Sequence, residues 1–156
     1  MQQSALANIR EFLNRCRFAM IGVSRDEKHF SRALYSEFLK NGYDVVPVNR
    51  GAEEIAGARA FHHIADVTPP VSAALILTPD DLTEQAVHES HAAGIRNLWL
   101  YGIAGMKPDD NPVLQFCAEN EISVVPGYCP FMFLDRSSKL HHFHGFLLKL
   151  VGKYPR

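Results

Sequence analysis

The stretch GVSRDEKHFSRALYSEFLKNGYDVVPVNR, residues 22–50, decides the fold, because it places a polar loop and a helix between two apolar runs. The first run, residues 17–23, leads into the loop. The helix expected over residues 31–40 ends at an Asn-Gly pair, which favours a left-handed helix end. The second run, residues 43–49, then returns to strand-forming residues. This order is typical of the first unit of a nucleotide-binding α/β fold.

Three further apolar runs continue the pattern, at residues 71–78, 96–102 and 122–127. Helical segments lie between them, one over residues 81–93 and one after the Asn-Pro pair that begins at Asn111. Short, nearly continuous apolar runs suit strands that are buried on both faces. We therefore expect an α/β fold, a Rossmann-like doubly wound parallel sheet of about five strands flanked by helices.

The chain of 156 residues is 47% hydrophobic, which suits a single domain over residues 1–156. Helical spacing predicts an N-terminal helix at about residues 4–15 and a C-terminal helical extension at about residues 137–152. The apolar stripe of that extension suits packing on the domain, on a second copy in a homo-oligomer, or on a partner protein. A less regular connection, residues 50–70, is expected to hold one strand-like piece near residues 58–61.

Charge and hydropathy argue against two classes of partner. The net charge of −1 gives no general attraction for nucleic acid, and no apolar run approaches the length of about 20 residues that a membrane span needs. The N-terminus also lacks the layout of a signal peptide. We expect a cytoplasmic protein that binds neither nucleic acid nor membrane.

The loop after the first strand has features of an anion site, although only Gly22 matches the G-x-G-x-x-G pattern of dinucleotide turns. Ser24 is small enough for close backbone approach. Ser31 is the expected N-cap, whose following amides would point at an anion, and Arg25 and Lys28 add positive charge. The alternative is that Ser31 only caps its helix and that both cations are solvated.

The end of the second strand discriminates between nucleotides. NAD enzymes place a carboxylate there for the ribose hydroxyls, whereas an arginine suits a phosphorylated ribose. Here Asn49 and Arg50 follow the strand, so NAD is disfavoured and NADP or coenzyme A is favoured. The alternative is that Arg50 is a surface residue that begins a loop.

The same residues carry a family resemblance. The Gly-x-Ser turn, the serine at the helix start and the segment GYDVVPVN resemble the small CoA-binding domain proteins, and the likeness continues through ALILTP, GIRNLWLYG and Cys129-Pro130. That family is Rossmann-like and related to the CoA-binding domain of the succinyl-CoA synthetase α-subunit. One departure is Arg50, which stands where the family usually has proline.

This resemblance implies a ligand, coenzyme A or an acyl-CoA, and a set of residues to contact it. Gly22, Ser24 and Ser31 would face the pyrophosphate, and Asn49 and Arg50 the adenosine end. Thr78 and Pro79 would lie in the third-strand loop beside the nucleotide, and Tyr101, Gly102 and Cys129 farther round the same rim. We expect a binding or regulatory protein rather than an enzyme, because the chain shows no phosphorylatable-histidine domain and no proton-transferring Tyr-Lys arrangement. The alternative is an NADP-dependent oxidoreductase with an unrecognised active site.

Histidine and cysteine side chains offer other chemistry. Eight histidines include the pairs His62-His63 and His88-His91 and a group at residues 141–144, but none has the spacing of a known zinc site. We expect no bound metal. Cys129 follows a strand beside the expected ligand, yet no partner base is evident, so a structural role is favoured over a nucleophilic one.

Overall fold

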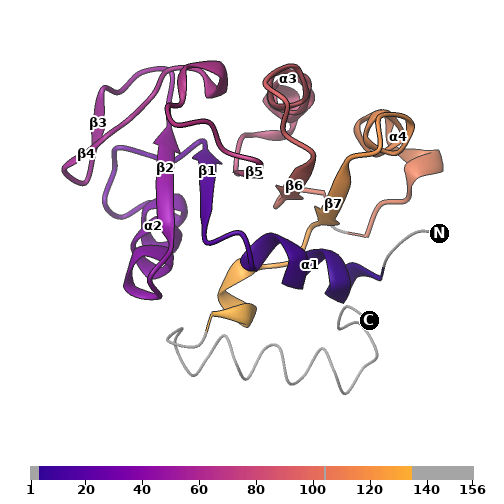
Figure 1. The fold of residues 1–156 in the computed structure, drawn as a ribbon, viewed down its shortest axis with the longest axis horizontal. Coiled ribbons are helices and arrows are strands. Elements are labelled where there is room, and N and C mark those ends of the chain that lie inside the picture. Colours follow the sequence, from indigo (N-terminus) through magenta and orange to yellow (C-terminus); the bar gives the residue numbers. More distant parts are fainter. Residues whose placement is uncertain (1–3, 104, 135–156) are drawn as a thin grey trace.

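The computed structural model describes residues 4–103 and 105–134, and it contains one five-stranded parallel sheet with the strand order β2-β1-β5-β6-β7 (Figure 1). Each apolar run supplies one of these strands. Their bounds are Arg17–Ile21 (β1), Asp44–Val48 (β2), Ala73–Ile76 (β5), Asn97–Leu100 (β6) and Ser123–Pro126 (β7). The order reverses direction after β2, as in doubly wound sheets. The predicted fold class is confirmed.

Helices cover both faces of the sheet. Figure 1 shows α1 and α2 on one face and α3 and α4 on the other. The α-helices are Ala5–Leu13 (α1), Phe30–Lys40 (α2), Asp80–Ala92 (α3) and Pro112–Glu119 (α4), and the short 3₁₀ helices are Ile64–Asp66 (η1), Pro108–Asp110 (η2) and Pro130–Phe133 (η3). The N-terminal helix predicted at about residues 4–15 is α1. The predicted C-terminal extension, residues 137–152, lies outside the described residues.

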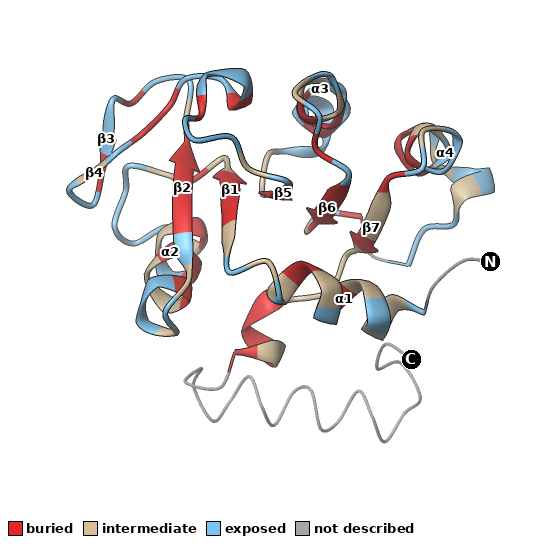
Figure 2. Cartoon of the chain, viewed as in Figure 1, coloured by how far each residue is buried: buried red, intermediate tan, exposed pale blue. Residues whose placement is uncertain are grey.

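The two cores follow from the alternation of side chains along each strand. Phe18 and Met20 of β1 pack toward α1 and α2, whereas Ala19 between them packs toward α3 and α4. Figure 2 shows the strands as the most buried part of the molecule. This burial on both faces explains why the runs are continuously apolar rather than alternating.

The irregular connection from β2 to β5, called the excursion below, lies beside the sheet. It contains a two-stranded antiparallel hairpin, Glu54–Ile55 (β3) with Ala58–Arg59 (β4), followed by η1. An isolated parallel bridge joins Val48 to Phe61. The strand-like piece predicted near residues 58–61 is therefore divided between β4 and this bridge.

The outer edge of β7 is contacted by α1, although α1 precedes the first strand in the chain. The side-chain amide of Asn8 donates to the carbonyl oxygen of Val124 at 2.9 Å. Phe12 packs edge-on against Trp99 of β6, with ring centroids 5.4 Å apart. The last described element, η3, lies on the same face of the sheet as α1 and contributes to the same core (Figure 1). Among the described residues, no helix is long and apolar enough to cross a membrane.

Candidate functional site

A cavity of about 490 Å³ lies at the carboxyl ends of β1, β2 and β5, bordered by α3 and the excursion. Ligands of open α/β sheets bind in this position, where the strand order reverses. Its apolar wall is formed by Ile21, Val48, Ile64, Leu77, Leu82 and Ala86. Its polar lining is formed by Ser24, His29, Asn49, Arg50, His62, Thr78 and Glu89. Such a wall with a few polar groups is typical of a small-molecule site.

Gly22 sits where β1 enters its loop and closely approaches the end of β5. Its φ is +93°, and a Cβ built there would lie 3.1 Å from the carbonyl carbon of Leu77. Its own amide donates to the carbonyl of Val48 at 3.0 Å. Glycine is favoured here because the positive φ strains any other residue and a Cβ would contact the Leu77 backbone closely.

The start of α2 differs from the prediction, since Ser31 is not the N-cap. The helix begins one residue earlier, at Phe30, and the capping residue is His29, whose Nδ1 accepts from the Ser31 amide at 3.2 Å. Ser31 lies in the first turn and is 1% exposed, and its Oγ accepts from the Ser24 amide at 2.9 Å. The serine therefore ties the loop to the helix from behind the cavity wall.

This arrangement fixes the tautomer of His29. A backbone amide can only donate, so the Nδ1 atom that faces the Ser31 amide must be unprotonated. The Ser31 hydroxyl, 2.8 Å from the same Nδ1, then donates to it as well. The proton of the neutral ring is on Nε2, and His29 lines the cavity. The ring thus keeps one N–H donor, at Nε2, that the helix cap does not use.

Asn49 joins the loops that follow β1 and β2. Its Nδ2 donates to the Val23 carbonyl at 2.7 Å, and its Oδ1 accepts from the Gly51 amide at 2.8 Å. The side chain lines the cavity with both ends engaged. Its role in this structure is to hold the two loops in register.

Arg50 also lines the cavity, but its guanidinium contacts a carboxylate that the sequence analysis did not identify. The Arg50 Nη2 atom lies 2.6 Å from Oε1 of Glu89, which belongs to the third turn of α3. The end of β2 itself carries no carboxylate, but α3 brings one beside Arg50. The sequence around Asn49 and Arg50 could not reveal it, because Glu89 is 39 residues away.

The loop after β5 brings Thr78 and Pro79 to the cavity. The hydroxyl of Thr78 lies 3.1 Å from that of Thr83, which is buried in the first turns of α3. Thr83 also lies 3.1 Å from the Pro79 carbonyl, to which it donates. These bonds fix the β5–α3 turn, so that Leu82 and Ala86 form the facing wall.

The remaining predicted residues do not line this cavity. Arg25 and Lys28 are exposed on the loop before α2. Tyr101 stacks on Phe30, with ring centroids 5.0 Å apart and planes at 30°. A Cβ at Gly102 would lie 2.9 Å from Asp80 Oδ1, so the backbone passes close to the start of α3.

Cys129 lies outside the cavity lining, and its environment does not activate the thiol. Burial raises its pKa, and this effect outweighs hydrogen bonds from the Phe131 and Met132 backbone that lower it. Burial likewise raises the pKa of Tyr101, with a smaller contribution from Cys129. A raised thiol pKa leaves less of the nucleophilic thiolate at neutral pH.

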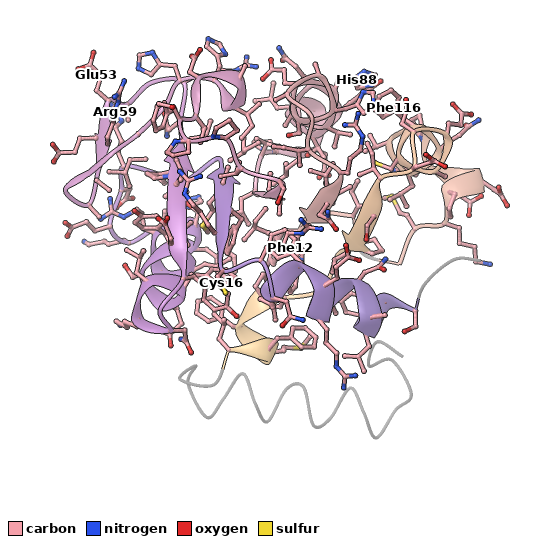
Figure 3. The ribbon with its side chains drawn as sticks, viewed as in Figure 1. Phe12, Cys16, Glu53, Arg59, His88 and Phe116 are labelled. Carbon is pink, nitrogen blue, oxygen red and sulfur yellow. The ribbon has the colours of Figure 1, made fainter. Side chains whose placement is uncertain are left out.

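Two histidine pairs fall within the described residues. His62 lines the cavity, as His29 does, although the sequence analysis weighed it only as a metal ligand. His88 stacks on Phe116 of α4 with ring centroids 4.0 Å apart (Figure 3). His91 meets the same ring edge-on. Within residues 4–103 and 105–134, no three histidine, cysteine or carboxylate side chains lie together as metal ligands. The histidines at 141–144 lie outside that part.

Comparison with known proteins identifies the family of this Rossmann-like domain. A model of the CoA binding domain matches residues 16–135, and the chain belongs to that family. The resemblance found in the sequence is thereby confirmed, and it supports CoA binding in general.

The chain is also similar to individual known proteins. The chain is 27% identical over 88 residues to the alpha subunit of ADP-forming acetate–CoA ligase II from Pyrococcus furiosus, covering 56% of this chain and 19% of that one. It is 29% identical over 72 residues to the uncharacterized YneT of Bacillus subtilis, covering 46% and 53%. The matches thus span about half or less of these curated relatives. A solved Thermus thermophilus protein, cell-free ID.343, shares the fold at a TM-score of 0.66 and 21% identity, covering 91% of this chain and 98% of its own.

Proposed function

We propose that this cavity binds the nucleotide part of coenzyme A or an acyl-CoA, and that the protein acts as a binding or regulatory protein rather than as a catalyst. The observation that carries the proposal is a cavity at the strand ends whose lining combines apolar side chains, Leu82 and Ala86 of α3 among them, with polar groups from the loops that follow β1 and β2. In this proposal the adenine ring packs against Leu82 and Ala86. The pyrophosphate lies at the Gly22–Ser24 turn, where the His29 Nε2–H donates to it.

Arg50 provides the charge that distinguishes coenzyme A from a nucleotide with an unmodified ribose. Its guanidinium lines the same cavity as the apolar wall, which suits a ribose phosphate. The chemistry of the lining therefore fits the nucleotide: an apolar slot, a turn closely packed at Gly22, a neutral N–H donor and a cation. The high thiol pKa at Cys129 supports a role without covalent chemistry.

Two leucines offer a matched pair for testing the adenine position. Leu82 on α3 and Leu39 on α2 are almost equally exposed, at 44% and 43%, but only Leu82 lines the cavity. Removing a partly buried leucine contact is expected to cost about 1 kcal/mol of binding. Calorimetric titration with CoA should therefore show about fivefold weaker binding for Leu82→Ala and unchanged binding for Leu39→Ala.

The same titrations separate the proposal from its main rival. NADP also carries a ribose phosphate, so an NADP-dependent oxidoreductase would use the same cavity and the same Arg50. If NADPH binds more tightly than CoA, or if Leu82→Ala leaves the affinity for CoA unchanged, the proposed function is wrong. Native mass spectrometry of the purified protein gives an independent reading through any nucleotide that co-purifies.

A further inference from the structure

Glu89 places a carboxylate against the guanidinium of Arg50. Among the described residues that line the cavity, Arg50 is the only one with a permanent positive charge. Oε1 of Glu89 lies 2.6 Å from Arg50 Nη2 and also accepts from Gln85 Nε2 at 3.0 Å. Arg50 reaches this contact from the loop after β2, and Glu89 from α3. The ion pair therefore joins two elements that border the cavity, and both of its members line it.

We propose that Glu89 determines specificity by competing with the ribose phosphate of the ligand for Arg50. This inference rests on the proposed function. A carboxylate and a phosphate offer the guanidinium the same kind of acceptor, so one can replace the other on its donor atoms. The side chains are 53% exposed for Arg50 and 35% for Glu89, so the carboxylate can turn toward water when a phosphate takes its place.

The competition lowers the affinity for ligands that carry the ribose phosphate. Binding of such a ligand must break the contact between Arg50 and Glu89, and it leaves a carboxylate close to the incoming anion. A ligand without that phosphate does not disturb the pair. Glu89 therefore reduces the preference for CoA over dephospho-CoA that Arg50 alone would create.

The experiment is a set of calorimetric titrations with CoA and dephospho-CoA. An exposed ion pair contributes up to about 1 kcal/mol, so Glu89→Gln should tighten CoA binding by about fivefold and leave dephospho-CoA within about twofold. Glu84→Gln is the matched control, because it removes the same charge from the same helix at a position outside the cavity lining. It should change neither affinity by more than about twofold.

Arg50→Met, alone and combined with Glu89→Gln, completes a double-mutant cycle. If Glu89 acts by occupying Arg50, Glu89→Gln should give a smaller gain in CoA affinity in the Arg50→Met background than in the wild type. An equal gain in both backgrounds, or an equal gain for both ligands, would mean general repulsion and would overturn the inference. Weaker dephospho-CoA binding by Glu89→Gln would also overturn it, because Glu89 would then be binding ribose hydroxyls.

The wild-type protein and the Leu82→Ala variant distinguish failure of this inference from failure of the proposed function. Absence of CoA binding by the wild type would sink the proposed function itself. CoA binding that depends on Leu82 but does not respond to Glu89→Gln would overturn only the competition at Arg50.

Discussion

Replacing Ser31 by alanine should destabilise the protein even though Ser31 does not cap α2. The hydroxyl accepts from the Ser24 amide at 2.9 Å and donates to His29 Nδ1 at 2.8 Å, and the residue is 1% exposed. Each buried hydrogen bond contributes about 1 kcal/mol net, so the two together contribute about 2 kcal/mol. Alanine recovers about 0.5 kcal/mol through its higher helix propensity. We expect a net loss of about 1.5 kcal/mol in the free energy of unfolding.

Ser36 provides the control on the same helix, because its side chain has no hydrogen bond to any residue that the structure describes. Ser36→Ala should leave stability unchanged or raise it slightly. Urea denaturation followed by the fluorescence of Trp99 suits the measurement, since this single tryptophan is fully buried and its indole N–H donates to the Tyr128 carbonyl.

Thermal melts should show a lower Tm for Ser31→Ala by roughly 3–6 °C. Equal unfolding free energies for Ser31→Ala and Ser36→Ala would refute the assignment of the two hydrogen bonds. CoA titration of the folded Ser31→Ala variant adds a second readout. If its affinity equals that of the wild type, the Ser24–Ser31 bond shapes the loop without positioning the phosphate.

Gly22→Ala should lower the free energy of unfolding more than Gly42→Ala does. Both glycines have a positive φ, but only a Cβ at position 22 would contact the Leu77 backbone, at 3.1 Å. Equal urea midpoints for the two variants would contradict this. Asn49→Asp should lose about 1–2 kcal/mol of stability, because the carboxylate cannot donate the hydrogen bond between the two loops, and calorimetry should show weaker CoA binding. Burial raises the pKa of the Cys117 thiol to about 12 in the folded protein. Above about pH 9 the thiol therefore ionises in the unfolded chain but not in the folded one, so the free energy of unfolding falls as the pH rises toward 12. Melts across this interval should fall less steeply for Cys117→Ala, and parallel curves would exclude the effect.

The fold could be predicted from the sequence because its evidence is local. Four strands of the main sheet, β1, β2, β5 and β6, are largely buried on both faces and so appear as continuous apolar runs. An Asn-Gly pair marks the end of α2 and an Asn-Pro pair the start of α4. The cap of α2 could not be predicted as reliably. Both His29 and Ser31 can accept a hydrogen bond, and the burial of Ser31 against the Ser24 amide, which decides between them, is a tertiary contact.

The sequence could predict those residues of the candidate site that lie in loops directly after strands, but not those that come from other elements. Gly22, Asn49 and Thr78 lie at the carboxyl ends of apolar runs, so the topology rule selected them. Glu89 and His62 come from the middle of a helix and from the excursion. Whether these side chains reach the cavity depends on how α3 and η1 pack against the sheet. Neither helical periodicity nor a local sequence motif indicates that packing.

The docking of α1 on the far edge of the sheet has a consequence for folding during synthesis. This helix leaves the ribosome before the strands of the sheet, but β7, whose Val124 carbonyl binds Asn8, is made more than a hundred residues later. Until β7 is added, Ile9 and Phe12 lack part of the surface that buries them. Contacts of such long sequence separation form slowly, so the nascent domain keeps an exposed apolar helix until translation has passed its last strand. A ribosome-bound chain halted before β7 should therefore bind chaperones that a chain halted after η3 escapes.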